Sequence, residues 1–313
     1  MTESPAPAAL RRWALAGSAL TFVLIVIGGV VRITGSGMGC GDHWPLCNGE
    51  WFPPLDLPTF IEIFHRWVAA LVSLAVAGTV FVAWRRHRGD RRLLLPAVLG
   101  AVLLVVQVLL GAVTVKLELP PRVVIVHLLN AMLVMGAVLW TALETGPLGR
   151  AGAAPDGRRG PRGAALAFAG FGLVVVLWGA QVANLHAGFV CRGFPLCQGA
   201  GLGPPDTSLG PLHWTHRILA YAFLVVAAAA ALRLRGPATP APVRRAAQAV
   251  LAATVAQVVI AAGMVLLELP AWLRALHLAG GAAVWAALVV LVHRVARTAW
   301  PAVPARTAAL AEA

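Results

Sequence analysis

Charged residues are scarce in this sequence, and acidic residues especially so. Only 12% of the 313 residues are Asp, Glu, Lys or Arg, while 59% are hydrophobic. Soluble domains carry about 25% charged residues. The composition therefore excludes an ordinary soluble domain and indicates a protein that lies within a membrane.

Uncharged apolar runs long enough to cross a bilayer, roughly 17–25 residues, recur along the chain. A lipid-exposed backbone must satisfy its own hydrogen bonds, and the alternating pattern of a transmembrane barrel is missing, so helices are expected. The first run has no small-residue cleavage site after it and is expected to remain as a helix. We predict an all-α polytopic membrane protein with eight transmembrane helices, near residues 13–31, 60–84, 93–115, 123–143, 163–185, 212–232, 246–267 and 272–292.

The chain has 25 Lys and Arg residues against 12 Asp and Glu, so its net charge is +13. Such an excess could reflect binding to nucleic acid. Most of the basic residues, however, fall at the N-terminus and in every second connection between the runs, which is one side of a membrane. By the positive-inside rule we predict that this side is cytoplasmic, that both termini lie there, and that nucleic acid is not a partner. The expected location is the plasma membrane of a bacterium.

The sequence repeats itself with a period of about 150 residues. The residues that coincide are types that rarely match by chance between apolar helices. We predict an N-terminal four-helix half at 1–143, a cytoplasmic linker at 144–162 and a C-terminal four-helix half at 163–313. Four spans return the chain to its starting side, so a pseudo-two-fold axis along the membrane normal should relate these two tandem four-helix bundles. The matches are Leu-Glu-Leu-Pro at 117–120 and 267–270, Gln107 with Gln257, Cys40 with Cys191, Cys47 with Cys197, and His65-Arg66 with His216-Arg217.

Four histidines, His65, His127, His216 and His277, lie near the starts of the second, fourth, sixth and eighth runs. These runs all begin on the outer side, so each half presents two imidazoles from different helices at a similar depth. Two histidines on facing helices can ligate one haem iron from its two sides. The alternative is that each is an interfacial side chain hydrogen-bonded to a neighbour.

Other metal centres have less support. A di-iron carboxylate site needs several glutamates and two Glu-x-x-His motifs, and the sequence has only Glu62-x-x-His65. Covalent haem attachment needs Cys-x-x-Cys-His, which is absent, and zinc needs a closer or mixed cysteine spacing. Of the remaining histidines, His87 and His293 on the cytoplasmic side are expected to be incidental, while His43, His186 and His213 near the outer surface stay unassigned.

Glu62 precedes His65 by three residues, so its carboxylate lies on the same helix face. The equivalent position in the second half is His213. An ionisable carboxylate beside a cofactor suits proton transfer, which favours the N-terminal half as the site of chemistry. The alternative is an interfacial Glu62 partnered by an arginine. Arg66 and Arg217 either hold the propionates of a haem or reach to the membrane interface as helix-end residues.

Cysteine is also rare, and all four cysteines fall in predicted outer loops. Thiols that are close in sequence tend to oxidise outside the cytoplasm. We therefore predict two disulfides, Cys40–Cys47 and Cys191–Cys197, which are either structural or redox-active.

Several motifs, taken in order, resemble the haem A synthase family. They are Gly-Gly-Val-Val-Arg at 28–32, Thr-Gly-Ser-Gly-Met at 34–38, Trp-Pro-Leu-Cys at 44–47, Glu62-x-x-His65-Arg66, the Leu-Pro-Pro before His127, the second cysteine pair, His216-Arg217 and His277. The resemblance spans nearly the whole chain. The loop between Cys40 and Cys47 is one residue longer than is usual in the family, and residues 181–186 depart from its Val-Arg-containing stretch.

The resemblance implies a reaction, the oxidation of a methyl group of haem O to the formyl group of haem A for terminal oxidases. It implies a substrate site in the N-terminal half, with Glu62 as the catalytic carboxylate and His65 and His127 around the haem. It implies haem b in the C-terminal half, with His216 and His277 as axial ligands, carrying electrons to a quinone or another acceptor. Haem O synthase, terminal oxidase assembly and a second copy of the chain are the partners that it suggests.

Two other functions stay open. A b-type cytochrome with two histidines per haem could relay electrons between a quinone and a partner, and would need the four histidines but not Glu62. A haem transporter could line a path with the histidines. Broken helices and buried charges, which favour transport, are few in this sequence.

Overall fold

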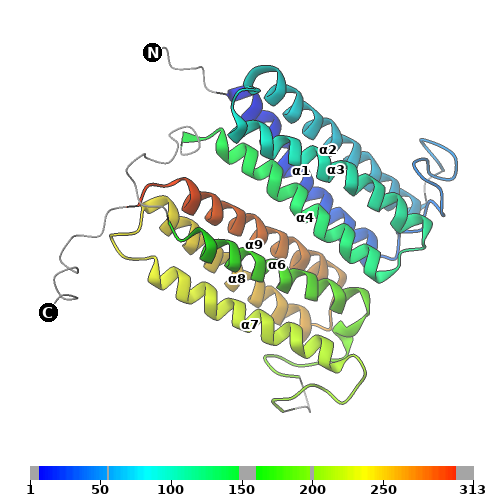
Figure 1. Cartoon of the computed structure of the whole chain (residues 1–313). Helices are drawn as coiled ribbons and strands as arrows, with labels where there is room; N and C mark the ends of the chain where they lie inside the picture. The colour runs from blue at the N-terminus through cyan, green and yellow to red at the C-terminus, as the bar shows by residue number, and fades with distance from the viewer. Residues whose placement is uncertain (1–6, 55, 148–159, 198–200, 301–313) are drawn as a thin grey trace, which may run out of the picture.

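The computed structural model describes residues 7–54, 56–147, 160–197 and 201–300 (Figure 1). These residues form no β-strand; they form long helices and one short 3₁₀ turn, η1 (Ala187–Phe189). Eight helices are long and apolar enough to cross a membrane, so the predicted all-α polytopic fold is confirmed. The helices are α1 (Ala8–Ile33), α2 (Leu57–His87), α3 (Arg91–Lys116), α4 (Pro121–Glu144), α6 (Arg162–Asn184), α7 (Gly210–Arg233), α8 (Ala241–Leu266) and α9 (Ala271–Arg297).

Each helix matches its predicted apolar run to within a few residues, and several continue into charged sequence. The last turn of α2 contains Arg85, Arg86 and His87, and that of α9 contains Arg294 and Arg297. Long basic side chains can reach the water layer from a helix end, and they interact favourably with the negative C-terminal end of the helix dipole. The helices therefore run beyond the apolar core of the membrane.

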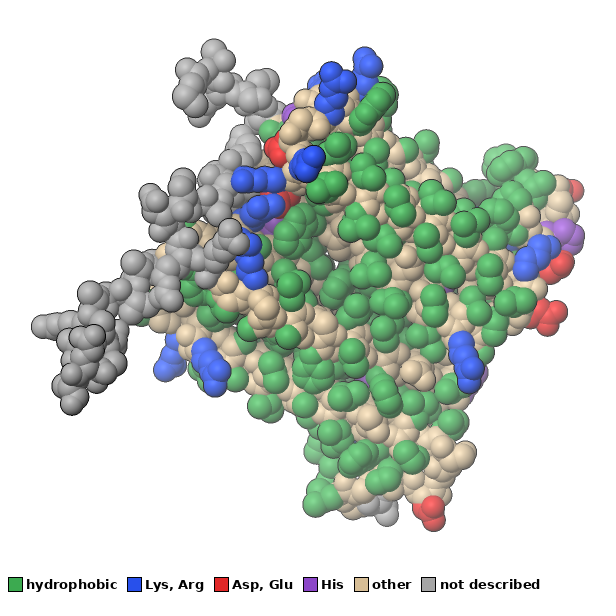
Figure 2. Space-filling view, in the orientation of Figure 1, with side chains coloured by type: hydrophobic (Ala, Val, Ile, Leu, Met, Phe, Trp, Pro, Cys, Tyr) green, Lys and Arg blue, Asp and Glu red, His purple; other side chains and the backbone are tan. Residues whose placement is uncertain are grey.

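Large apolar side chains stand exposed on the outside of the helices. Val225 is 67% exposed, Val259 64% and Leu109 59%. Figure 2 shows hydrophobic side chains over the flank of the molecule and Lys and Arg gathered where α1 begins and α9 ends. We call this the basic end, and the opposite end, which carries the α1–α2 and α6–α7 connections, the loop end. An apolar flank of this extent suits lipid rather than water.

The helices pack as two rings of four. In the first ring α1 packs on α2, α2 on α3, α3 on α4 and α4 on α1, so α2 and α4 lie diagonally across it. The second ring has the same order, with α7 and α9 on a diagonal. The boundaries at 1–143, 144–162 and 163–313, and the axis relating the halves, stay predictions. Residues 148–159 of the expected linker lie outside the described part of the chain.

One turn recurs in both halves at the place that the sequence repeat marks. The Glu and Leu of 118–119 and of 268–269 adopt left-handed φ angles between 58° and 61°. The N–H of Leu119 and that of Leu269 then donate to carbonyls in the last turn of the preceding helix, at 2.8 and 2.7 Å. A proline follows each turn and caps the next helix. His127 and His277 therefore lie at the same depth in α4 and α9.

Helix α9 joins the two rings, since it packs on α1 and α4 as well as on α6 and α8. The indole N–H of Trp285 in α9 donates to the carbonyl of Met132 in α4 at 2.8 Å, inside the largest apolar core. Nearer the loop end, Arg32 of α1 donates to the carbonyl of Ala183 at the end of α6, at 2.9 Å. Polar bonds thus fasten the rings at two depths.

A third tie lies at the basic end. Glu144 of α4 is buried, and its Oε1 accepts from Nε of Arg297 in α9 at 2.7 Å. His293 is fully buried in the same contact, with Nε2 3.6 Å from Glu144 Oε1 and its ring edge-on to Trp140. We expected His293 to be incidental, and the sequence did not predict its burial against Glu144. Glu144 of α4 and His293 of α9 belong to different rings and come together only through packing.

We expect Arg297→Ala to destabilise the contact between the rings. The change leaves the buried carboxylate of Glu144 without its cation, and breaking a buried ion pair from one side costs about 3–5 kcal/mol. The detergent-solubilised variant should lose its helical circular-dichroism signal at a clearly lower temperature than the parent. Arg233→Ala, at the exposed end of α7, is the matched control and should unfold near the parent temperature. Equal midpoints for Arg297→Ala and the parent would contradict this role.

Candidate functional site

The four predicted ligand histidines lie roughly two turns inside their helices from the loop end. His65 is on α2, His127 on α4, His216 on α7 and His277 on α9. Each pair occupies the diagonal of its ring. His65 lies near enough to His127 for an electrostatic interaction between them, and the same holds for His216 and His277. The structure therefore brings together the pairs that the repeat predicts.

A glycine of the neighbouring helix lies against one histidine of each pair. A Cβ atom at Gly28 of α1 would lie 3.2 Å from Nε2 of His65. A Cβ atom at Gly179 of α6 would lie 2.8 Å from Cε1 of His216, too close to be accommodated without movement. The two glycines occupy matching places in the repeat. They keep space beside the imidazoles that any other residue would fill.

The ring nitrogens of these histidines have few protein partners. In the described part of the chain, Nδ1 of His127, His216 and His277 is buried without a hydrogen bond. A neutral imidazole that keeps its proton on Nδ1 presents the lone pair of Nε2 to a metal. Two imidazoles supply only two ligands, so the remaining positions around an iron would be filled by the nitrogens of a porphyrin. The diagonal pairs and the glycines beside them fit a haem in each ring.

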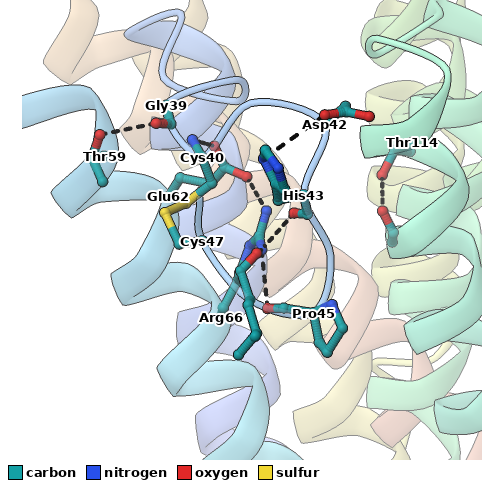
Figure 3. A network of polar contacts seen from close by, with 12 residues as sticks. Gly39, Cys40, Asp42, His43, Pro45, Cys47, Thr59, Glu62, Arg66 and Thr114 are labelled. Carbon is teal, nitrogen blue, oxygen red and sulfur yellow. Dashed lines mark hydrogen bonds and ion pairs between the residues drawn. A yellow bond between two sulfur atoms is a disulfide. The ribbon is translucent and has the colours of Figure 1, made fainter. Parts of the chain in front are cut away.

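Glu62 is held by two donors at the loop end of α2. Its side chain is buried; Oε2 accepts from the backbone N–H of Cys40 at 2.8 Å, and Oε1 accepts from Arg66 at 2.5 Å (Figure 3). The alternative prediction for Glu62, pairing with an arginine, is therefore observed, and the arginine is Arg66. The carboxylate lies one turn from His65 and directly below the disulfide loop. A catalytic role for Glu62 stays a prediction.

Arg66 also fastens the first outer loop. Its second guanidinium nitrogen donates to the carbonyls of His43, Pro45 and Leu46 at 3.0, 3.1 and 2.9 Å (Figure 3). These are loop contacts, and propionate binding by Arg66 stays a prediction. Arg66 therefore ties the helix that carries His65 to the first outer loop.

An arginine holds the outer loop of the second half in the same way, and we call each such arginine, Arg66 or Arg217, an arginine clamp. Arg217 donates to the carbonyls of Cys191, Gly193 and Pro195 at 2.7, 2.8 and 3.4 Å. At the position equivalent to Glu62, the buried His213 bonds the carbonyl of Ala187 through Nδ1 at 2.9 Å. His213, left unassigned by the sequence, thus anchors the second outer loop. It brings no carboxylate.

Both predicted disulfides, Cys40–Cys47 and Cys191–Cys197, are present. Each closes the loop that an arginine clamp holds from below. The extra residue in the first loop does not prevent its bridge. Whether either bridge has a redox role stays a prediction.

Two carboxylates outside the spans fix the first loop and the start of α2. Asp42 pairs with Lys116 of α3 at 3.3 Å, and the hydrogen bond and charge of Lys116 hold the pKa of Asp42 below its ordinary value. Asp56 caps α2 by accepting from the N–H of Thr59 at 2.9 Å, and its bonds with Thr59 lower its pKa. Both contacts require the charged form. They are therefore present above the ordinary carboxyl range and weaken as the pH falls through the lowered pKa values.

Sequence analysis missed one polar group beside His127. Nε2 of Gln107 lies 3.0 Å from Nε2 of His127, and Asn130 donates to Oε1 of Gln107 at 2.8 Å. Gln107 was noticed only as a repeat match. Asn130 had a usable signal, because it is a polar residue in an apolar run and its repeat counterpart is Gly280.

Comparison with known proteins finds similarity over most of the chain. A family model described as cytochrome oxidase assembly protein matches residues 11–58 and 56–289. The chain is 32% identical over 232 residues to the protein named Heme A synthase of Geobacillus kaustophilus, covering 71% of each chain. It is 32% identical over 223 residues to the Heme A synthase of Bacillus licheniformis, covering 69% of this chain and 72% of that one. For the Heme A synthase of Shouchella clausii the identity is 34% over 198 residues, covering 61% and 64%.

We expect the purified protein to show the spectrum of a low-spin haem that depends on the pair in the second ring. His216→Leu removes one imidazole of that pair, so most of this spectrum should be lost. His213→Leu is the control, because His213 lies on the same helix but bonds a loop carbonyl. It should keep the spectrum. Full retention of the low-spin signal in His216→Leu would rule out His216 as an iron ligand.

Proposed function

The chain belongs to the haem A synthase family of cytochrome oxidase assembly proteins, and we propose that it oxidises a methyl group of haem O to the formyl group of haem A. The substrate haem O binds in the first ring, between His65 and His127. The second ring holds haem b through His216 and His277.

The observation that carries this assignment is the difference between the two rings at one position. Both rings have a histidine pair, a glycine beside it, an arginine clamp and a disulfide loop. Among the described residues, only the first ring has a buried carboxylate one turn from the pair, since the position of Glu62 is taken by His213 in the second. A site that changes its substrate needs a group that moves protons, whereas a site that only passes electrons does not.

The protein groups divide the work as follows. His65 and His127 bind the substrate through its iron and set its orientation in the ring. Converting a methyl to a formyl group adds one oxygen atom, supplied by water, and removes four protons and four electrons. Glu62 receives a proton at the edge of the substrate. Haem b, when bound, accepts electrons one at a time and passes them to a quinone or another acceptor.

Each carboxylate oxygen of Glu62 accepts one hydrogen bond, one from the Cys40 N–H and the other from Arg66. A carboxylate oxygen has two lone pairs, so each keeps one that can receive a proton. The guanidinium of Arg66 also holds the loop carbonyls. Glu62 and the first outer loop therefore share Arg66 as a bonding partner.

The proposed function also implies a membrane location, an orientation and partners for the protein. The basic end faces the cytoplasm of a bacterium, the loop end lies outside, and the fold spans the plasma membrane. Haem O comes from the haem O synthase, and haem A goes to terminal oxidases under assembly. A second copy of the chain is a further expected partner.

The test is Glu62→Gln in the purified, haem-loaded protein. Gln keeps the size of Glu but cannot cycle a proton, and general acid–base groups contribute about 10²–10⁴-fold. We expect the variant to keep its haem b spectrum and to lose conversion of haem O to haem A by a factor of that order, measured by chromatography of extracted pigment.

Two variants serve as controls for this test. Glu62→Asp keeps a carboxylate and should retain part of the conversion. His213→Gln changes the matching position in the second ring and should retain most of it. Conversion near the parent rate in Glu62→Gln contradicts the catalytic role, and equal losses in the Gln and Asp variants would mark Glu62 as structural. A parent protein that binds haem but makes no haem A would favour an electron-relaying cytochrome.

A further inference from the structure

A chain of three polar side chains lies inside the first ring. Asn130 of α4 is buried, and its Nδ2 donates to the carbonyl of Leu103 and to Oε1 of Gln107, both at 2.8 Å. Nε2 of Gln107, on α3, lies 3.0 Å from Nε2 of His127. The chain runs from a backbone carbonyl to an iron-ligand nitrogen.

The direction of every bond in this chain follows from its fixed end. The carbonyl of Leu103 can only accept, so the amide nitrogen of Asn130 must face it. The second hydrogen of that nitrogen goes to Oε1 of Gln107. The amide nitrogen of Gln107 therefore faces His127, and Nε2 of His127 must be the acceptor. The imidazole keeps its proton on Nδ1, the atom that is buried without a partner in the described residues.

This bond occupies the lone pair that an axial ligand needs. For His127 to bind iron through Nε2, the hydrogen bond from Gln107 must break, and the Gln107 amide is left beside the iron without its acceptor. A buried donor without a partner is unfavourable. His127 is thus a weakened ligand, although its position in the ring is fixed.

The described residues of the second ring form no such chain of hydrogen bonds. The counterpart of Asn130 is Gly280, and the space where a Cβ would stand there is taken by Oε1 of Gln257. That oxygen has no donor among the described residues. Nε2 of Gln257 donates to the backbone carbonyl of His277 at 2.7 Å and is 3.4 Å from the Nε2 atom of the same residue. The amide is turned to the backbone, so the lone pair of His277 is much less engaged.

We propose that Gln107, aligned by Asn130, makes His127 an exchangeable iron ligand, so that the first ring releases its haem while the second ring retains its own. The inference rests on the proposed function, in which the first ring must take up haem O and release haem A at every turnover. Gln107 and Asn130 are positioning residues in this scheme. The exchange of Asn130 for Gly280 separates a substrate site from a cofactor site within one repeated frame.

Haem release tests this directly. The purified protein is loaded to saturation with ferric haem b as the probe and mixed with an excess of apomyoglobin, and the transfer is followed at the Soret band. The parent should release haem in a fast and a slow phase. Gln107→Leu should slow the fast phase by roughly 5- to 30-fold, the factor expected for one or two hydrogen bonds. It should also raise the low-spin fraction of the ferric spectrum.

The repeat supplies the matched control, Gln257→Leu, which should leave the fast phase unchanged. Asn130→Gly, which copies the second ring, keeps Gln107 but frees its amide and should slow the fast phase by a smaller factor. It replaces Gln107→Leu as the deciding variant if that protein does not fold. A helix-packing role alone would lower the unfolding temperature without slowing release. A single phase in the parent, or a fast phase unchanged in the variants, overturns the proposal.

The release assay is independent of catalysis, so the two proposals can fail separately. If the parent makes haem A but Gln107→Leu releases haem as fast as the parent, ligand exchange by Gln107 is wrong and the proposed function stands. If the parent makes no haem A, the proposed function fails. In that case the haem-release phases alone decide whether His127 is a more exchangeable iron ligand than the histidines of the second ring.

Discussion

A polar side chain within the hydrocarbon layer must find its partner inside the protein, and the architecture follows from this constraint. Glu62 takes a backbone N–H and Arg66, Trp285 takes the carbonyl of Met132, and Glu144 takes Arg297. Apart from the Glu62–Arg66 pair, which lies within α2, each bond joins a helix to a loop or to another helix. The polar residues of this apolar chain therefore fix which helices lie side by side and at what height, while the apolar residues fill the space between them.

The two rings show how one frame can serve two purposes. The diagonal histidines, the glycines beside them and the arginine clamps recur in both rings. Two differences lie at polar positions around the pairs: Glu62 corresponds to His213 in the repeat, and Asn130 corresponds to Gly280. These substitutions leave the packing of the rings alike and change what the side chains near the iron ligands can donate or accept. In our proposal, these two differences distinguish the ring that binds the substrate haem from the ring that binds the cofactor haem.

Hydrogen bonds connect the outer loops to the helices that carry the paired histidines. Arg66 and Arg217 each directly follow one of the paired histidines in the sequence. Each donates hydrogen bonds to three carbonyls of an outer loop, and a disulfide closes that loop. Each outer loop is therefore bonded directly to the helix that carries one of the paired histidines.

Much of this was determined by the sequence alone. Apolar runs set the eight helices, and the repeat set the histidine pairs and the cysteine bridges, because residue type and spacing are local properties of a chain. The partners of Glu62 and His213, the chain from Asn130 to His127 and the burial of His293 against Glu144 were decided by the tertiary structure. Except for the Glu62–Arg66 pair, which lies within α2, their members come from different helices or from a helix and a loop, and hydropathy describes each segment by itself. Which donor meets which acceptor depends on the rotation and height at which helices pack, and those are fixed only when the whole ring is assembled.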